Sequence, residues 1–366
     1  MIFYSITNMD FPANNLGQRA SRATEKSLRA LIYDLPSELI ALYPPAVRGT
    51  SRLLVLDRKS GRMEHRAYNE LPEFLRPGDC LVLNDTKVMR ARLFAHDSSG
   101  NTHELLVLER HSMDESVGAF RAIYKGRLEV GADLSVSDAT LHVEKIEGGG
   151  IATFRASASL KKIMELSGHV PIPPYLKRPD EPIDVERYQT IFSQRAGSVA
   201  APTASLNITD EMLGKMSRKG ITIAYITLHV GAGTFLPIRT DNPEEHIMHS
   251  EYFMIPAQTA ALIKETRASG GRIIAAGTTV ARTLEFAHKR IEDEADEIAG
   301  EADIFIYPGY AFKVIDGLLT NFHAPRSTVL MLAAAFVGQD ALLGAYHEVI
   351  ALKYRFLSYG DSMLIL

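Results

Sequence analysis

The sequence has a single cysteine, Cys80, among its 366 residues. One cysteine cannot form an internal disulfide, an iron–sulfur cluster or a cysteine-based zinc site. No apolar run reaches the roughly 18–20 residues that a membrane-spanning helix needs. The segment Met1–Asp10 lacks the basic and apolar regions of a secretory signal. We therefore expect a cytoplasmic protein with no membrane partner.

The chain also lacks an excess of basic residues, because its formal net charge is -4. This charge excludes a uniformly basic nucleic-acid binder but allows a local basic patch. Lys87, Arg90 and Arg92, which follow Asn84 and Asp85, are candidates for such a patch. A positive surface of this kind is typical of a protein that binds phosphates, and equally of a solvated strand edge.

Residues 80–157 show no helix-length periodicity. Short runs typical of strands are separated there by turn-rich pieces, which predicts a small β-barrel or sandwich. The predicted strands are Cys80–Asn84, Val88–His96, His103–Glu109, Ala119–Lys125, Asp133–Val136, Leu141–Ile146 and Ile151–Ala156. A Pro-rich segment further along, Val170–Leu176, must be extended rather than helical.

Strand and helix patterns alternate in the rest of the chain, which predicts a mostly parallel sheet with helices packed on it. The predicted strands include Ile221–Val230, Arg272–Ala276, Asp303–Tyr307 and Ser362–Leu366. The predicted helices include Asp184–Gln194, Pro256–Ser269, Thr279–Lys289, Ser327–Phe336 and Asp340–Tyr354. We therefore predict an α/β domain built from residues 31–79 and 158–366, an inserted small β-barrel domain at 80–157, and an N-terminal extension at 1–30.

The stretch from Ile304 to Pro325 places polar and aromatic residues where two predicted strands end. The apolar run Ile304–Tyr307 is typical of a buried strand, and Tyr310 follows its end. A second run leads into Asn321 and His323. Ligand sites of open α/β sheets lie beyond the carboxyl ends of strands. These residues are therefore site candidates, although ordinary turns give the same pattern.

Two glycine-containing loops follow other predicted strands. The loop His229–Phe235 lacks the third glycine of a dinucleotide or methyltransferase fingerprint, and Pro237 stands where the helix should run. We interpret it as a loop whose glycines let the backbone approach another group closely, with His229 as a site residue or a core histidine. In Gly277–Thr279, exposed N–H groups could hold a carboxylate or hydroxyl, or simply begin a helix.

Histidines offer no convincing metal site. His246 and His249 would lie on one face of a helix, but no third ligand is evident. We therefore expect no metal.

A set of motifs, in order from about residue 32 to the C-terminus, resembles the S-adenosylmethionine:tRNA ribosyltransferase-isomerase family of queuosine biosynthesis. The motifs are Tyr33–Ala41, Leu83–Val88, Arg90–Leu93, Glu186–Thr190, Gly197–Ala204, Thr227–Phe235, His249–Glu251, Gly277–Thr279, Tyr307–Tyr310, Thr320–His323 and Tyr354–Asp361. Two departures are visible: Asn207 stands where the family usually has a histidine, and residues 1–30 precede the usual start.

The resemblance implies an enzyme that uses S-adenosylmethionine as a substrate and needs no cofactor. Its ribosyl part would be transferred, with isomerisation, to the aminomethyl group of a 7-deazaguanine at the wobble position of tRNA. Epoxyqueuosine-tRNA, adenine and methionine would be the products. This chemistry needs a base beside the sulfonium, an acid for adenine departure and a base for the acceptor amine. The titratable candidates in matching motifs are His229, Glu251, Asp316, His323 and Asp361, and the sequence does not divide the steps among them.

We expect the site in a cleft between the two domains of a monomer. The predicted substrate-binding residues on the α/β side are Gly231, Gly233, Thr278, Tyr307, Tyr310 and Asn321. The predicted contacts to the tRNA anticodon loop are Asn84, Asp85, Lys87, Arg90 and Arg92. The two tyrosines would stack against unstacked bases, and the basic residues would position phosphates.

Two other classes of protein fit parts of the pattern. One is an α/β transferase or hydrolase that acts on a small nucleotide without RNA. The other is a non-catalytic RNA-binding β domain attached to an α/β scaffold.

Overall fold

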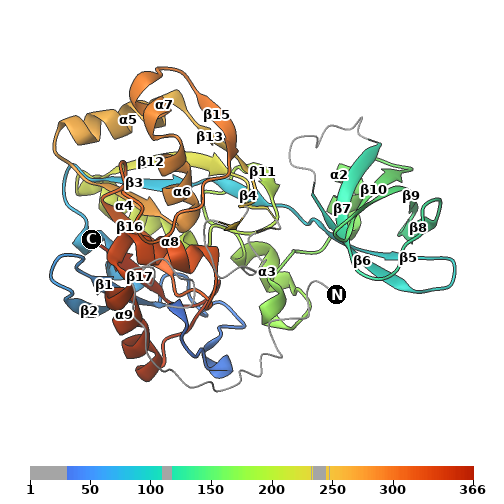
Figure 1. Cartoon of the computed structure of the whole chain (residues 1–366), viewed down its shortest axis with the longest axis horizontal. Coiled ribbons are helices and arrows are strands. Elements are labelled where there is room, and N and C mark those ends of the chain that lie inside the picture. The colour runs from blue at the N-terminus through green and yellow to red at the C-terminus, as the bar shows by residue number, and fades with distance from the viewer. Residues whose placement is uncertain (1–30, 109–117, 232, 234–244, 247) are drawn as a thin grey trace. The chain divides into compact units, whose positions relative to one another are not determined.

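The protein folds into two compact units. The computed structural model describes residues 31–108, 118–231, 233, 245–246 and 248–366 (Figure 1). The barrel unit comprises residues 87–188 and 196–200. The α/β unit comprises the described residues of 31–86, 189–195 and 201–366. The segments that lead from one unit to the other, β4 (Thr86–Val88) and β11 (Arg195–Ser198), form a two-stranded sheet.

The α/β unit is built on a nine-stranded sheet of order β15-β13-β12-β3-β14-β16-β17-β1-β2. Its four central strands are parallel neighbours: β12 (Thr222–Leu228), β3 (Cys80–Asn84), β14 (Ile273–Ala276) and β16 (Gly317–Asn321). The outer strands are β15 (Ile298–Ala302), β13 (Glu251–Ile255), β17 (Ser362–Ile365), β1 (Arg52–Leu56) and β2 (Met63–Ala67). The outer pairings are antiparallel except that between β17 and β1, so the sheet has a parallel centre and mixed flanks.

Three of the four central strands are buried along their whole length. Every residue of β3, β14 and β16 is buried, whichever face of the sheet it points to. Near-continuous apolar strands of this kind are typical of parallel sheets covered on both faces. On one face, Leu81 and Leu83 pack with Met212 and Met216. The helices of this unit are α1 (Leu71–Phe74), α4 (Asp210–Arg218), α5 (Ala257–Ala268), α6 (Thr278–Phe286), α7 (His288–Asp293), α8 (Thr328–Val337) and α9 (Gln339–Ala351), with short 3-10 turns η3 (Ser37–Leu39), η4 (Tyr68–Glu70) and η6 (Thr203–Ser205).

The barrel unit contains a closed antiparallel barrel of order β10-β7-β6-β5-β8-β9. Its strands are β5 (Arg92–His96), β6 (Thr102–Val107), β7 (Ala119–Tyr124), β8 (Asp133–Val136), β9 (Ala139–Gly148) and β10 (Ile151–Ala156). Buried and exposed residues alternate along these strands, so one set of side chains fills the interior. Phe120 and Phe154 stack there, with ring centroids 5.5 Å apart. The helical segments of this unit are α2 (Leu160–Ser167), η5 (Pro174–Leu176) and α3 (Pro182–Arg187).

The predicted fold class, an α/β domain with an inserted small barrel, is confirmed. The structure differs from the expected boundaries at Cys80–Asn84, which is the central strand β3 and not a barrel strand. This segment is apolar through Leu83 instead of alternating, as a strand covered on both faces requires. The unit that holds the barrel also extends beyond the predicted 80–157, because α2, the Pro-rich segment and α3 belong to it.

Three local predictions differ from the structure. Ile304–Tyr307 is irregular, and the strand lies earlier, at β15. Strand β13 was not predicted, and the helix expected at Asp184–Gln194 is the shorter α3. Within the described residues, no single helix is long and apolar enough to cross a membrane; α8 and α9 satisfy that test only as a pair bent by 113°.

Candidate functional site

The carboxyl ends of the parallel strands β12, β3, β14 and β16 meet at one edge of the sheet, which we call the carboxyl edge. Strands β13 and β17 run antiparallel to their neighbours β12 and β16 and therefore begin at this edge. Nine of the predicted site residues lie at or directly beyond these strand ends: Asn84, Asp85, His229, Gly231, Glu251, Thr278, Asn321, His323 and Asp361. Sequence segments that are far apart thus converge where ligands of such sheets bind.

His229 is held in place by the chain that follows β3. Its Nδ1 lies 2.8 Å from Oγ1 of Thr86, and its ring stacks on Tyr252 with centroids 5.8 Å apart. The buried Asn84 amide donates to the Leu228 carbonyl at 3.0 Å and accepts the Leu228 N–H at 3.1 Å. Asn84 therefore fixes the end of β12, and its amide faces the protein interior rather than a surface that RNA could reach. Thr86, which lies in the same motif as Asn84, was not among the predicted site residues.

Asp85 is a buried carboxylate with few compensating partners. Its side chain accepts a hydrogen bond from Thr227 Oγ1 at 2.6 Å, and Arg195 Nε lies 3.9 Å from Oδ2. Burial raises the pKa of Asp85, and this effect outweighs the opposing influence of Thr227 and Arg195. A carboxyl group with a raised pKa at a ligand-binding edge is suited to proton transfer.

Glu251 links the loop after β12 to helix α6. One of its oxygens accepts the Gly231 N–H at 2.7 Å, and the other lies 2.8 Å from Nη2 of the buried Arg282. Arg282 Nη2 also donates to the Ala302 carbonyl at 3.0 Å. Sequence reasoning missed Arg282, although its place in the helix that follows the Gly277–Thr279 motif was the available signal. The pairing compensates both buried charges and fixes the Gly231 backbone.

Gly233 touches the side chain of His249. A Cβ atom at position 233 would lie 2.3 Å from Cδ2 of the His249 ring, closer than any real contact. Only glycine permits this approach, as the loop interpretation expects.

Asn321 and His323 form a second group at the carboxyl edge. Thr203 Oγ1 donates to Asn321 Oδ1 at 2.8 Å. Nε2 of His323 lies 2.6 Å from Thr320 Oγ1. The backbone N–H of His323 donates to the Tyr346 hydroxyl at 2.9 Å. Burial lowers the pKa of His323 to about 3, so its imidazole is neutral at physiological pH. His323 can therefore exchange hydrogen bonds but supplies no positive charge.

Asp361 is saturated with donors. It accepts hydrogen bonds from Arg52 N–H at 2.8 Å, Arg52 Nε at 3.1 Å and Arg355 N–H at 2.8 Å. The Arg52 guanidinium also lies over the Tyr354 ring, 3.9 Å from its centroid. Asp361 thus joins the start of β17 to β1.

Asp316 lies at the opposite edge of the sheet and not with the other titratable candidates. It precedes β16 and accepts the N–H of Ile273, at the start of β14, at 2.9 Å. A strand of this length separates its ends by roughly 15 Å.

Tyr310 donates to Glu285 at 3.2 Å and, with Asp316, lines a cavity of about 950 Å³. Tyr307 packs on Phe305, with ring centroids 5.4 Å apart.

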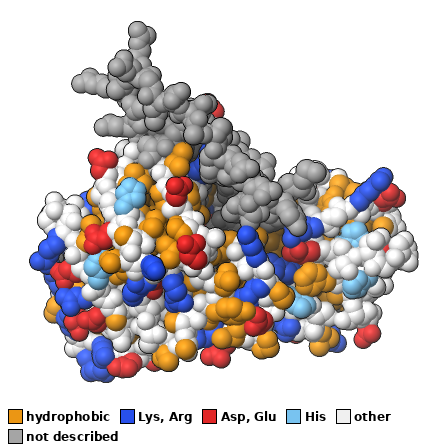
Figure 2. Space-filling model, turned by 90° about the horizontal axis from the view of Figure 1, so that it is seen from below, with side chains coloured by type: hydrophobic (Ala, Val, Ile, Leu, Met, Phe, Trp, Pro, Cys, Tyr) orange, Lys and Arg blue, Asp and Glu red, His pale blue; other side chains and the backbone are white. Residues whose placement is uncertain are grey.

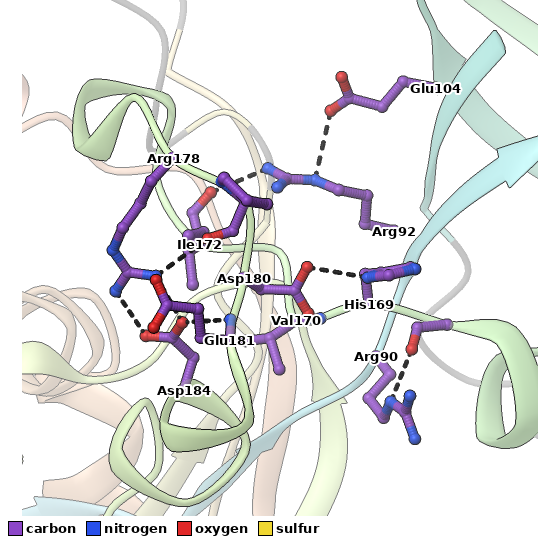
Figure 3. Close-up of polar contacts among 12 residues, drawn as sticks. Arg90, Arg92, Glu104, His169, Val170, Ile172, Arg178, Asp180, Glu181 and Asp184 are labelled. Carbon is purple, nitrogen blue, oxygen red and sulfur yellow. Dashed lines mark hydrogen bonds and ion pairs between the residues drawn. The ribbon is translucent and has the colours of Figure 1, made fainter. Parts of the chain in front are cut away.

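The three predicted basic tRNA contacts belong to the barrel unit, and two of them bond within it (Figure 3). Lys87 is exposed. Arg90 Nε donates to the Gly168 carbonyl at 2.6 Å. Arg92 lies 3.2 Å from Glu104 and donates to the Ile172 carbonyl at 2.9 Å. On the face shown in Figure 2, basic and acidic side chains of the described residues are interspersed.

No group of three or more His, Cys, Asp or Glu side chains among the described residues is arranged to hold a metal ion. His246 and His249, the predicted histidine pair, are both described, whereas Ile247 between them is not. His249 contacts Gly233, and His246 packs edge-on against Phe305 at 4.9 Å.

Comparison with known proteins identifies the family. The model of the family described as "Queuosine biosynthesis protein" matches residues 28–365. The chain therefore belongs to the queuosine biosynthesis protein family, as its motifs predicted.

Its relatives carry one enzyme name. The chain is 55% identical over 336 residues to the S-adenosylmethionine:tRNA ribosyltransferase-isomerase of Chlorobaculum parvum, covering 91% of this chain and 98% of the relative. It is 45% identical over 349 residues to the protein of the same name from Syntrophomonas wolfei. This match covers 93% of this chain and 97% of the relative. The crystal structure of S-adenosylmethionine tRNA ribosyltransferase from Thermotoga maritima is similar, with a TM-score of 0.54, 35% identity and coverage of 92% of this chain and 100% of that chain.

Proposed function

We propose that this protein is an S-adenosylmethionine:tRNA ribosyltransferase-isomerase. It transfers and isomerises the ribosyl part of S-adenosylmethionine onto the 7-aminomethyl-7-deazaguanine at the wobble position of tRNA. The products are epoxyqueuosine-tRNA, adenine and methionine. The observation that carries the proposal is the match to relatives of this name over almost their whole length.

Asp85 and His229 carry the proton transfers in this proposal. Asp85 combines burial with a raised pKa, and His229 is oriented by Thr86 and Tyr252. Glu251 and Asp361 are candidates from the motifs, but their oxygens already meet arginines and backbone N–H groups. Their role is therefore to position the loop after β12 and the start of β17.

S-adenosylmethionine binds along the carboxyl edge in this proposal. Gly231 and Gly233 let the loop backbone approach it, and Thr278 offers N–H groups at the start of α6. Asn321 contributes its amide, and the neutral His323 contributes a hydrogen bond that brings no positive charge near the sulfonium. Tyr307 remains a proposed contact, whereas the bond from Tyr310 to Glu285 favours a structural role for Tyr310.

The proposal also covers the part of tRNA that binds, the cofactor, the oligomeric state and the location. The anticodon loop is the part of tRNA that binds, because it contains the wobble base. The enzyme acts as a cytoplasmic monomer without a cofactor, since S-adenosylmethionine is itself the ribosyl donor. Lys87, Arg90 and Arg92 supply positive charge for phosphates near the barrel unit.

Adenine release tests this function. The enzyme is incubated with S-adenosylmethionine and tRNA that carries 7-aminomethyl-7-deazaguanine, and free adenine is measured. Adenine should appear only with the modified tRNA, and tRNA with guanine at the wobble position is the matched control. Asp85→Asn and His229→Gln should lower turnover at saturating tRNA.

Two results would contradict the proposal. Adenine release that is independent of tRNA would indicate an enzyme acting on a small nucleotide. Tight tRNA binding without any adenine release would indicate a non-catalytic RNA-binding protein.

A further inference from the structure

His169, which directly precedes the Pro-rich segment, pairs with Arg92 of β5 through a backbone bridge. Arg92 N–H donates to the His169 carbonyl at 3.2 Å, and His169 N–H donates to the Arg92 carbonyl at 2.8 Å. Two residues further along β5, Phe94 points outward and is 37% exposed. The rings of Phe94 and His169 meet edge to face, with centroids 5.0 Å apart. An aromatic ring and an imidazole thus share one exposed surface, which we call the Phe94–His169 platform.

Asp180 fixes the orientation of the His169 ring (Figure 3). His169 Nδ1 lies 2.9 Å from Asp180 Oδ1, and Asp180 Oδ2 accepts the Val170 N–H at 2.9 Å. The His169 side chain is nonetheless 45% exposed, and none of the described residues bonds its Nε2. The imidazole is therefore held by one nitrogen and presents the other outward.

A buried ion pair anchors the chain that carries Asp180. Arg178 donates to both oxygens of Asp184 at 2.7 and 2.8 Å, and Asp184 also accepts the Glu181 N–H at 2.8 Å (Figure 3). Asp184 is fully buried. The segment is thus fixed on both sides of Asp180, which makes the platform rigid before any ligand binds.

Basic side chains lie next to the residues of the platform. Arg90 is exposed, and within the described part of the chain its guanidinium bonds the carbonyl oxygens of Gly168 and Glu165 and no carboxylate. Glu104 is shared by two cations, Arg92 at 3.2 Å and Lys125 at 2.6 Å. An exposed aromatic ring, an imidazole and basic side chains are the groups that bind unstacked nucleotides.

We propose that the Phe94–His169 platform binds an unpaired nucleotide of the RNA substrate, by stacking its base and by a hydrogen bond to His169 Nε2. The inference rests on the proposed function, which supplies an RNA with an unstacked loop. It adds a contact that the basic residues after β3 do not provide, because stacking depends on the base and not on the phosphate. The chain from His169 to Asp180 gains a role in substrate recognition.

The test uses the full-length enzyme and an anticodon stem-loop RNA with 7-aminomethyl-7-deazaguanine at the wobble position. Separate RNAs carry 2-aminopurine at one loop position each, because its fluorescence reports stacking. Phe94→Leu keeps an apolar side chain without an aromatic face. His169→Asn keeps an amide that can donate to Asp180 but removes the ring and Nε2. The matched control is His142→Asn, because His142 forms a similar pair with Asp133 at 2.7 Å on the same barrel and is 47% exposed.

Phe94→Leu and His169→Asn should each raise the Kd for the RNA by about tenfold, the usual effect of losing one base–aromatic stack. The salt dependence of Kd should not change for Phe94→Leu, since no charge is removed. One 2-aminopurine position should lose its fluorescence change in both variants. His142→Asn should bind the RNA as the wild type does.

Three results would overturn the inference. Wild-type affinity in both variants would exclude the contact. An equal loss of affinity in His142→Asn would indicate a general effect of the barrel surface. A loss of RNA affinity in His169→Asn alone, together with a lower Tm, would show that the His169–Asp180 pair serves folding and not RNA binding. Adenine release by the wild-type enzyme distinguishes failure of this inference from failure of the proposed function. That assay tests the reaction itself and does not depend on whether the Phe94–His169 platform binds a nucleotide.

Discussion

Glu285 should be one of the main determinants of stability in the α/β unit. It lies on α6, is 1% exposed, and receives four hydrogen bonds from the segment that begins at Tyr310. One oxygen accepts the N–H groups of Val314 and Ile315 at 2.9 and 3.0 Å. The other accepts the Lys313 N–H at 2.8 Å and the Tyr310 hydroxyl at 3.2 Å. A single carboxylate thus ties an irregular segment to a helix.

The substitution Glu285→Gln should destabilise this unit by about 3 kcal/mol. The glutamine oxygen can still accept two N–H groups, but these bonds lose their charge assistance, and the new amide group faces two donors. Hydrogen bonds to a charged group contribute about 1.5–3 kcal/mol each, and neutral ones about 0.5–1.5 kcal/mol. Relief of the buried charge offsets part of the loss. For a unit of this size, about 3 kcal/mol corresponds to a decrease in Tm of roughly 6–12 °C.

Calorimetry and amide hydrogen exchange check this prediction. The transition of the α/β unit should move down in Glu285→Gln, and the amides of Lys313, Val314 and Ile315 should lose protection. Glu265→Gln is the matched control, because Glu265 is exposed on α5. A Tm within about 2 °C of the wild type, together with protected amides at these three positions, would refute the reasoning.

The other predictions concern the carboxyl edge and the barrel unit. Thr86→Val keeps the shape of Thr86 but removes the hydroxyl that contacts His229 Nδ1. The kcat for adenine release should therefore fall about tenfold, while the KM for tRNA stays unchanged. A change in KM alone would contradict this prediction. Burial lowers the pKa of His323 from 6.5 to about 3, so between these pH values the unfolded chain binds a proton that the folded chain does not. Stability should therefore fall as the pH is lowered through this range, and His323→Gln should show a flatter dependence of Tm on pH; equal slopes would exclude this contribution. Asp184→Asn removes the negative charge beside the buried Arg178. This loss should lower the free energy of unfolding of the barrel unit by about 3–5 kcal/mol, measured by denaturant unfolding. An unchanged denaturant midpoint would show that the ion pair contributes little to stability.

Local patterns in the sequence determined much of the fold. Short strand-like runs separated by turn-rich pieces predicted the barrel strands from Arg92 to Ala156. Buried and exposed residues alternate along these strands in the structure, because an antiparallel barrel buries every second side chain. Apolar runs next to glycine predicted β12, β14 and β16, and with them the residues at their carboxyl ends. The same signal misplaced Ile304–Tyr307, since hydrophobicity alone does not distinguish a strand from an irregular buried segment.

The sequence by itself determined the family, through motifs whose order and spacing extend along the chain, and it determined most of the strands whose ends form the carboxyl edge. Only the tertiary structure decided which candidates occupy that edge and how they are paired. Asp361 meets Arg52, which lies 309 residues away in the sequence, whereas Asp316 falls at the opposite end of β16. The physical reason is that strand direction and pairing, which depend on distant segments, decide where a side chain lies and which groups compensate its charge.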